Sequence, residues 1–216
     1  MKTRQTTHEE HQPEPDVVAL ENDVGVRPGF FATLLSEGDD WSFVIKTHAL
    51  IEAAVSHLLG EVPGHPELVE TFSQIELSGV RTGKLAFAEV LGCLDKSERR
   101  TIRKLSELRN RLVHDVSNVD FNFSDWTQSL EKGQLKEFAN AFGPSSESLD
   151  INGTQVLSTE FFKQNARLNI WLACLFLLSL IYQRKDLARV RREAELSREK
   201  LLQQILAVRS TSPKPV

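Results

Sequence analysis

The pattern of hydrophobic and polar residues is helical along most of this chain. From Trp41 to Leu59 apolar residues recur three or four positions apart, and Asp39 or Asp40 can cap that helix. A second long helix is predicted over Ser97–His114, with a buried stripe of Ile102, Leu105, Leu108, Leu112 and Val113. Because there is little β signal anywhere, the pattern predicts an all-α protein, built as an antiparallel helical bundle with a long C-terminal helix.

Shorter elements are predicted between and after these two helices. Residues 30–35 and residues 67–72 indicate short helices. Residues 118–124 alternate polar and apolar side chains and are predicted to be extended. A further helix is then predicted from about residue 125 to residue 142.

The last third of the chain is predicted to be one long helix, over about residues 159–208, broken once. Its middle, residues 170–182, is almost wholly apolar but falls short of the ~20 residues that span a bilayer. A helix buried on all sides, in the domain or in a dimer, is therefore favoured over a membrane anchor. Farther along, apolar residues at heptad-like intervals could pair with another chain or lie along RNA: Leu187, Val190, Ala194, Leu201 and Ile205.

These elements divide the chain into a core with appendages. The first 28 residues are polar and acidic and are predicted to form a mobile arm, in which His8 and His11 have no partner cluster that would make a metal site. The other predicted divisions are a helical core over 29–142, a loop over 143–157, the C-terminal helix over 158–209 and a tail over 210–216.

Composition narrows the possible partners. The 216 residues are 40% hydrophobic and 26% charged, which suits a soluble core, and the net charge of −4 excludes a general polyanion binder. Nucleic-acid contact would therefore need a local basic patch. Cys93 and Cys174 match no metal-ligand spacing and are expected to be buried thiols in a reducing cytoplasm, and the polar N-terminus predicts no secretory signal.

The candidate chemistry lies in residues 108–115, Leu-Arg-Asn-Arg-Leu-Val-His-Asp. His114 can act as an acid or base near neutral pH, and Arg109 offers a planar cation matched to phosphate. Asn110 could orient the reacting group. On a regular helix, however, five positions rotate a side chain by about 140°, so Arg109 and His114 converge only if the helix ends or bulges between them.

Basic residues gather on the same helix as the motif. Arg99, Arg100, Arg103, Lys104 and Arg111 form the only dense basic surface close to it, and Arg103, Lys104 and Arg111 are candidate contacts for a phosphodiester backbone. Basic helix faces are usually only solvated. The neighbouring motif is what favours a role in binding here.

Two polar residues lie on or beside the apolar stripe of the first long helix. His48 and Glu52 are one turn apart, where an unpaired charge would be costly. Arg109 is the expected partner of Glu52, in a pair that we expect to be structural. The sequence Thr82-Gly-Lys is not a P-loop, because the upstream glycine spacing and a preceding strand are missing.

The spacing from Arg109 to His114 resembles the Arg-x4–6-His signature of HEPN domains (higher eukaryotes and prokaryotes nucleotide-binding), many of which are metal-independent ribonucleases. The wider setting, a Glu-bearing helix, a short helix and a helix ending in Arg-Asn-x-x-x-His, also resembles the mannitol repressor family, a HEPN-like all-α group. This likeness covers about residues 30–142. It supports the pairing of Glu52 and makes Lys84 a candidate for phosphate contact. Val113 departs from it, since related chains often carry a small residue there.

The resemblance implies a HEPN-like endoribonuclease without metal or cofactor. His114 would donate or accept a proton, Arg109 would stabilise the phosphate and Asn110 would orient it. Family members often place two motifs face to face across a homodimer and commonly serve as toxins or defence effectors restrained by a regulatory protein partner. Two alternatives stay open: a non-catalytic transcriptional regulator resembling the mannitol repressor, and an interaction module in which Arg109 and His114 are only structural.

Overall fold

A computed structural model describes residues 17–36, 38–79, 81–144 and 146–211. Helices make up most of the described chain, so the prediction of a helical protein is confirmed, and the two strands described form a small hairpin. In chain order the elements are α1 (Val17–Val24), α2 (Phe30–Ser36), α3 (Asp40–Glu61), α4 (Leu68–Ser73), α5 (Lys84–Val90), α6 (Lys96–Val113), the 3-10 helix η1 (Val116–Asp120), α7 (Phe123–Ser129), α8 (Lys132–Phe142), β1 (Ser148–Ile151), β2 (Thr154–Leu157), α9 (Ser158–Gln164) and α10 (Ala166–Thr211).

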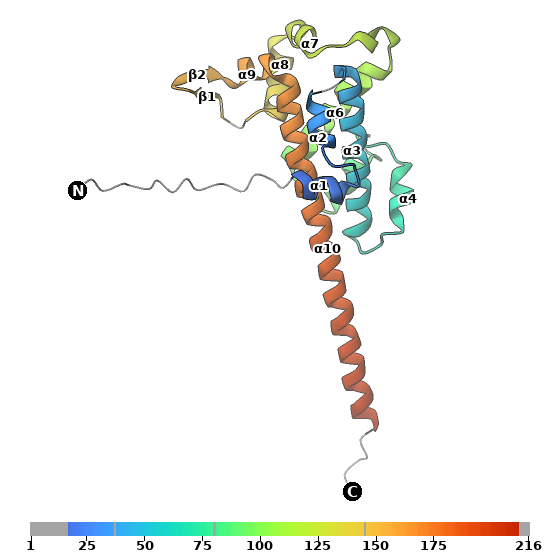
Figure 1. Cartoon of the computed structure of the whole chain (residues 1–216). Coiled ribbons are helices and arrows are strands. Elements are labelled where there is room, and N and C mark those ends of the chain that lie inside the picture. The colour runs from blue at the N-terminus through green and yellow to red at the C-terminus, as the bar shows by residue number, and fades with distance from the viewer. Residues whose placement is uncertain (1–16, 37, 80, 145, 212–216) are drawn as a thin grey trace, which may run out of the picture.

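The centre of the molecule is the packing of α3 against both α10 and α6, which lie beside it (Figure 1). Every turn of α3 contributes apolar side chains with no exposed surface, namely Val44, Ile51, Val55, Leu58 and Leu59. Helix α6 buries the predicted stripe except for Val113, which is exposed at the last helical position. A helix with this pattern is stable mainly because its apolar stripe leaves water.

Helix α10 is much longer than the body it packs against and continues well past it (Figure 1). By length and composition alone, α10 is the one helix among the described residues that could cross a membrane. Half of its most apolar stretch is buried inside the protein. The expectation that residues 170–182 are buried on all sides is wrong for the single chain. Leu172 and Phe176 are exposed, because α10 turns only one face toward α3.

Part of the predicted N-terminal arm is structured. Residues 17–24 form α1, which packs against α10 and buries Leu20. The carboxylate of Glu21 is also buried, and it accepts hydrogen bonds from the backbone N–H groups of Gly29 (2.8 Å) and Phe31 (2.9 Å). These contacts hold the first turn of α2, which the sequence pattern could not show. The rest of the arm, including His8 and His11, lies outside the described residues.

The region after α6 differs from its prediction in two places. Only Phe121 and Asn122 of residues 118–124 are extended: Asp115 accepts a hydrogen bond from the N–H of Ser117 (2.9 Å) and begins η1, and α7 starts at Phe123. The helix predicted over residues 125–142 is two helices, α7 and α8, because the extended backbone of Leu130 ends the first of them.

The predicted loop over residues 143–157 contains the antiparallel hairpin β1–β2, with Ile151 opposite Thr154. Asn152 and Gly153 form its turn with φ of 53° and 81°, the left-handed conformations that a tight hairpin turn needs. The predicted single break in the last helix falls at Asn165, which separates α9 from α10. Its side-chain amide donates to the carbonyl of Phe161 (3.1 Å).

Replacing Glu21 with Ala should lower the free energy of unfolding by about 1–3 kcal/mol, because the buried N–H groups of Gly29 and Phe31 lose their acceptor. Urea unfolding followed by circular dichroism measures this loss. The matched control is Glu70→Ala, which removes an exposed helical carboxylate. Equal midpoints for the two variants would contradict the capping role of Glu21.

Candidate functional site

Helix α6 begins at a well-formed cap. Asp95 accepts hydrogen bonds from the N–H groups of Ser97 (2.7 Å) and Glu98 (2.8 Å), and the Glu98 carboxylate accepts one from the N–H of Asp95 (2.7 Å). This capping box fixes the start of the helix. Glu98 also pairs with Arg184 of α10 (2.6 Å), which ties the first turn of α6 to the longest helix in the described chain.

Helix α6 stays regular through the candidate motif. The N–H of His114 donates to the carbonyl of Asn110 at 3.3 Å, and His114 has helical dihedral angles of −85° and −10°. The last helical residue is Val113, and His114 caps the helix with near-helical dihedral angles, so the backbone neither bulges nor turns away between Arg109 and His114. Their side chains leave the helix about 140° apart, and one chain does not bring the two together on one face.

The outer face of α6 carries three exposed arginines and an exposed histidine. Arg100, Arg103, Arg111 and His114 are spaced by three, eight and three positions, which places them within about 80° of one another around the helix. Within the described ranges these four side chains have no hydrogen-bond or ion-pair partner. We call them the α6 outer face. Over its roughly 21 Å length three arginines face solvent, and the carboxylate of Glu107, which pairs with Lys104, lies in the same arc between Arg103 and Arg111.

Lys104, also predicted to bind phosphate, is held elsewhere. Its ammonium group pairs with Glu107 (2.8 Å) and Glu137 (2.7 Å) and lies 5.1 Å from the centre of the Phe138 ring. Burial lowers the pKa of Lys104, but the bonds to the two carboxylates outweigh it and leave the pKa raised. Lys104 therefore links α6 to α8 and contributes little free charge to a ligand.

Arg109 belongs to the inner side of α6, next to the buried residues Leu105, Leu108 and Leu112. It is half-buried, and its guanidinium donates to the side-chain oxygen of Asn110 at 3.0 Å. Asn110 is thus engaged by its neighbour in the motif.

A partly buried polar cluster lies between α3, α5 and α6. Lys84, only 1% exposed, donates to Glu52 at 2.9 Å, and the other oxygen of Glu52 lies 3.8 Å from His48 Nδ1. His48 Nε2 is 3.2 Å from the hydroxyl of Ser106. We call Glu52, Lys84, His48 and Ser106 the inner cluster.

The inner cluster corrects two predictions. Glu52 pairs with Lys84 and not with Arg109, and Lys84 is too deeply buried to reach a phosphate group in solvent. The pairing and the burial of Lys84 both follow from the packing of α5 onto α3, which brings the ammonium group of Lys84 to the Glu52 carboxylate. The sequence analysis also missed Ser106. Its position on the buried side of α6, beside Leu105, is the feature that could have indicated a polar contact in the core.

Burial keeps His48 neutral at neutral pH. Desolvation by burial lowers its pKa to about 4; Glu52 opposes this shift, and the positive charges of Arg109 and Lys84 reinforce it. The influence of Arg109 places its charge in the neighbourhood of the inner cluster. At neutral pH His48 is therefore a hydrogen-bonding group of the core and carries no charge.

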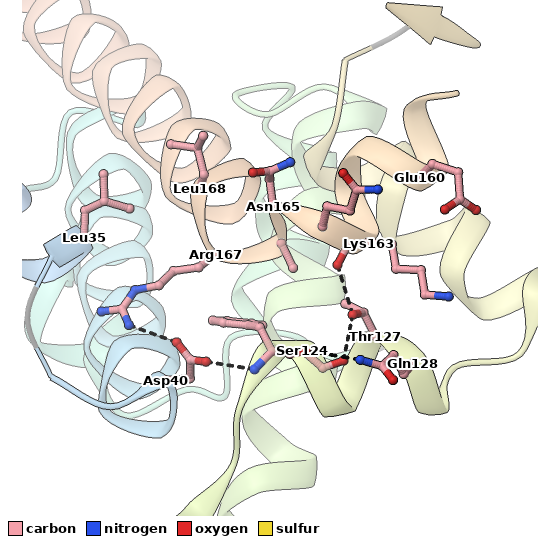
Figure 2. A pocket seen from close by; sticks show the side chains of 13 residues that line it. Leu35, Asp40, Ser124, Thr127, Gln128, Glu160, Lys163, Asn165, Arg167 and Leu168 are labelled. Atoms are coloured by element: carbon pink, nitrogen blue, oxygen red, sulfur yellow. Dashed lines mark hydrogen bonds and ion pairs between the residues drawn. The ribbon is translucent and has the colours of Figure 1, made fainter. Parts of the chain in front are cut away.

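A separate hollow of about 690 Å³ lies among α2, α3, α7, α9 and α10 (Figure 2). Its polar groups bond one another: Arg167 pairs with Asp40 (2.9 Å), Asp40 accepts from the N–H of Phe123 (2.8 Å), and Thr127 donates to the carbonyl of Lys163 (3.1 Å). Such mutual bonding indicates a structural junction, so this hollow is not the candidate site.

Comparison with known proteins identifies no relative: no family model, no curated protein and no solved structure matches this chain. The functional reading therefore rests on the residues and contacts of the chain itself.

Replacing Lys84 with Met should lower the free energy of unfolding by about 3 kcal/mol, the lower end expected for a buried pair, because Glu52 keeps some contact with water. Adding Glu52→Gln should recover part of the loss, since no unpaired carboxylate then remains. Chemical denaturation of both single variants and the double variant measures the coupling. Strictly additive losses would exclude a direct interaction.

Acidification should destabilise the protein through His48. Because its folded pKa of about 4 is below the unfolded value of 6.5, its contribution to stability is complete above pH 6.5 and is lost as the pH falls toward 4, by about 3 kcal/mol in total. His48→Gln should flatten the stability profile between these pH values, measured by urea unfolding. His65→Gln, at an exposed site, should leave the wild-type slope; an unchanged slope in His48→Gln would contradict the assignment.

Proposed function

We propose that this protein is a HEPN-like, metal-independent endoribonuclease that holds RNA across the α6 outer face. The observation that carries the proposal is that Arg100, Arg103, Arg111 and His114 share one exposed face, free of partners within the described residues. A row of unpaired arginines attracts a phosphodiester backbone, and a histidine at its end is placed to act on the bound strand. Such an enzyme suits a toxin or a defence effector in the cytoplasm.

The chemistry requires a base, an acid and a cation. His114 removes the proton from a ribose 2′-hydroxyl, the oxygen attacks the adjacent phosphorus, and the bond to the 5′-oxygen breaks. The products are a 2′,3′-cyclic phosphate and a 5′-hydroxyl whose proton comes from a second acid. His114 of a second copy fits that role, in line with the resemblance to dimeric HEPN nucleases.

In this enzyme Arg111, and not Arg109, would stabilise the phosphate. Arg111 lies three positions before His114 on the same face, so it is the arginine suited to stabilise negative charge on the phosphate oxygens. Arg109 instead faces the inner side of α6, where its charge contributes to keeping His48 neutral. We assign Arg109 a positioning role, through Asn110 and the packing of α6.

A second candidate function is favoured by the inward position of Arg109. If the motif serves only helix packing, the protein is a non-catalytic regulator of the kind that the mannitol repressor resemblance suggests, or an interaction module acting through protein contacts. Exposed apolar residues along α10 are consistent with such contacts.

Cleavage of a mixed RNA pool in the presence of EDTA separates the two functions. Wild type should cleave and leave 2′,3′-cyclic ends, and His114→Ala should lose about 10²–10⁴-fold in rate while keeping its fold. Arg111→Ala should lose rate as well. His65→Ala, the replacement of another exposed histidine, is the matched control and should cleave like wild type.

Binding provides a second readout. Arg100→Ala with Arg103→Ala should weaken RNA binding and reduce its salt dependence, because fewer phosphates are neutralised. Folded wild-type protein that neither binds nor cleaves RNA would exclude the nuclease and favour the regulator.

A further inference from the structure

Helix α10 has a second apolar face, which near the start of the helix lines a hollow with Phe142 and Phe161 and farther along faces solvent. Leu172 and Phe176 are 51% and 68% exposed, and Leu187, Val190 and Leu201 farther along are about half exposed. At 100° per residue these five fall within about 60° of one another around the helix, opposite the buried side that contains Cys174, Leu178 and Ile181. We call this exposed stripe the α10 seam. Gln183 and Ser197 interrupt the stripe, and the apolar residues on either side of them offer area for a contact with another molecule.

The distal half of α10 lacks support from its own chain. The ion pair of Arg192 with Glu61 (2.9 Å) lies where the helix leaves the body, and residues 193–206 are exposed at every position (Figure 1). Five large apolar side chains lie in that stretch: Leu196, Leu201, Leu202, Ile205 and Leu206. Because an isolated helix is only marginally stable in water, a projecting helix of this kind gains stability by packing against a partner.

The seam follows a heptad register. The core positions of a heptad are called a and d. Here position a is taken by Leu187, Ala194 and Leu201, and position d by Val190 and Ser197. The charged positions that flank such a core are then fixed. They are Asp186, Glu193 and Lys200 on one side and Arg191 and Arg198 on the other, where Ile205 takes the next position.

The flanking charges favour a second copy of this chain as the partner of the seam, with the two helices parallel. In a parallel, in-register pair of identical helices, each flanking residue of the first side meets the residue five positions later on the other chain. Asp186 then meets Arg191, and Glu193 meets Arg198, in both symmetric copies. An antiparallel pair over the same residues would set Arg191 against Arg198.

We infer that two copies of this chain associate in parallel through the α10 seam, forming a coiled coil over about residues 187–206. The buried side of α10 is the opposite one, and residues 193–206 are exposed at every position; at the start of the stretch Leu187 and Arg191 also line a hollow shared with residues 61–64 and 91–93. Ala194, Ser197 and Gln204 supply little apolar area to the core, so the dimer forms reversibly with concentration.

Light scattering coupled to size exclusion tests the association on the full chain. Wild type should approach twice the chain mass of 24.4 kDa as its concentration rises. Leu187→Glu with Leu201→Glu should raise the dissociation constant by at least about tenfold, the equivalent of 1.4 kcal/mol. The matched control, Leu196→Glu with Leu206→Glu, changes two exposed leucines that lie off the seam and should dimerise like wild type.

Disulfide trapping tests the direction. Leu201→Cys should link to itself on mild oxidation, because a parallel pair places residue 201 beside its own copy, whereas Leu196→Cys should not. The native thiols of Cys93 and Cys174 are buried, so wild type should stay unlinked. A monomer at all concentrations, or equal loss in the seam variants and their control, would overturn the inference. A dimer in which Leu201→Cys does not link would overturn the parallel arrangement, and neither readout depends on RNA cleavage.

Discussion

The unbroken backbone of α6 is the constraint on which the rest of the candidate site depends. From the capping box at Asp95 to the last i→i−4 bond at His114, the helix has no bulge, so sequence position alone decides which side chain meets the core and which meets water. Arg109 goes inward and His114 outward. A regular helix thus divides a single sequence motif between two environments, one partly buried and one exposed to solvent.

The inner cluster is costly to desolvate because it contains a buried charged pair. Lys84 is removed from water with only one carboxylate in contact, and Glu52 retains partial access to solvent. Such a pair contributes less to stability than apolar packing of equal volume would, while removal of either member is costly. Its main effect is to define how α5 sits on α3. A neutral His48 bonded to Ser106 then joins α3 to α6 without adding a further charge to the same space.

Sequence reasoning succeeded where a single helix determines its own pattern. The extents of α3 and α6, the cap near Asp95 and the break before α10 all follow from local periodicity and capping residues. It failed where a side chain meets a partner far away in the chain. Nothing near Lys84 shows that its ammonium group reaches Glu52, and nothing near Glu21 shows that it will cap α2. The expected pairing of Glu52 with Arg109 was wrong for the same reason: several cations were within reach of one helix, and only the packing of α5 selects among them.

The ion pair of Glu98 with Arg184 gives α10 a mechanical connection to α6. Glu98 is at the same time a member of the capping box, so its carboxylate serves two helices with one pair of oxygens. A force on the projecting part of α10 meets the ion pair of Arg192 with Glu61 first and that of Arg184 with Glu98 about two turns later. A displacement that passes the first pair would reach Glu98 and loosen the first turn of α6, from which the row of arginines begins.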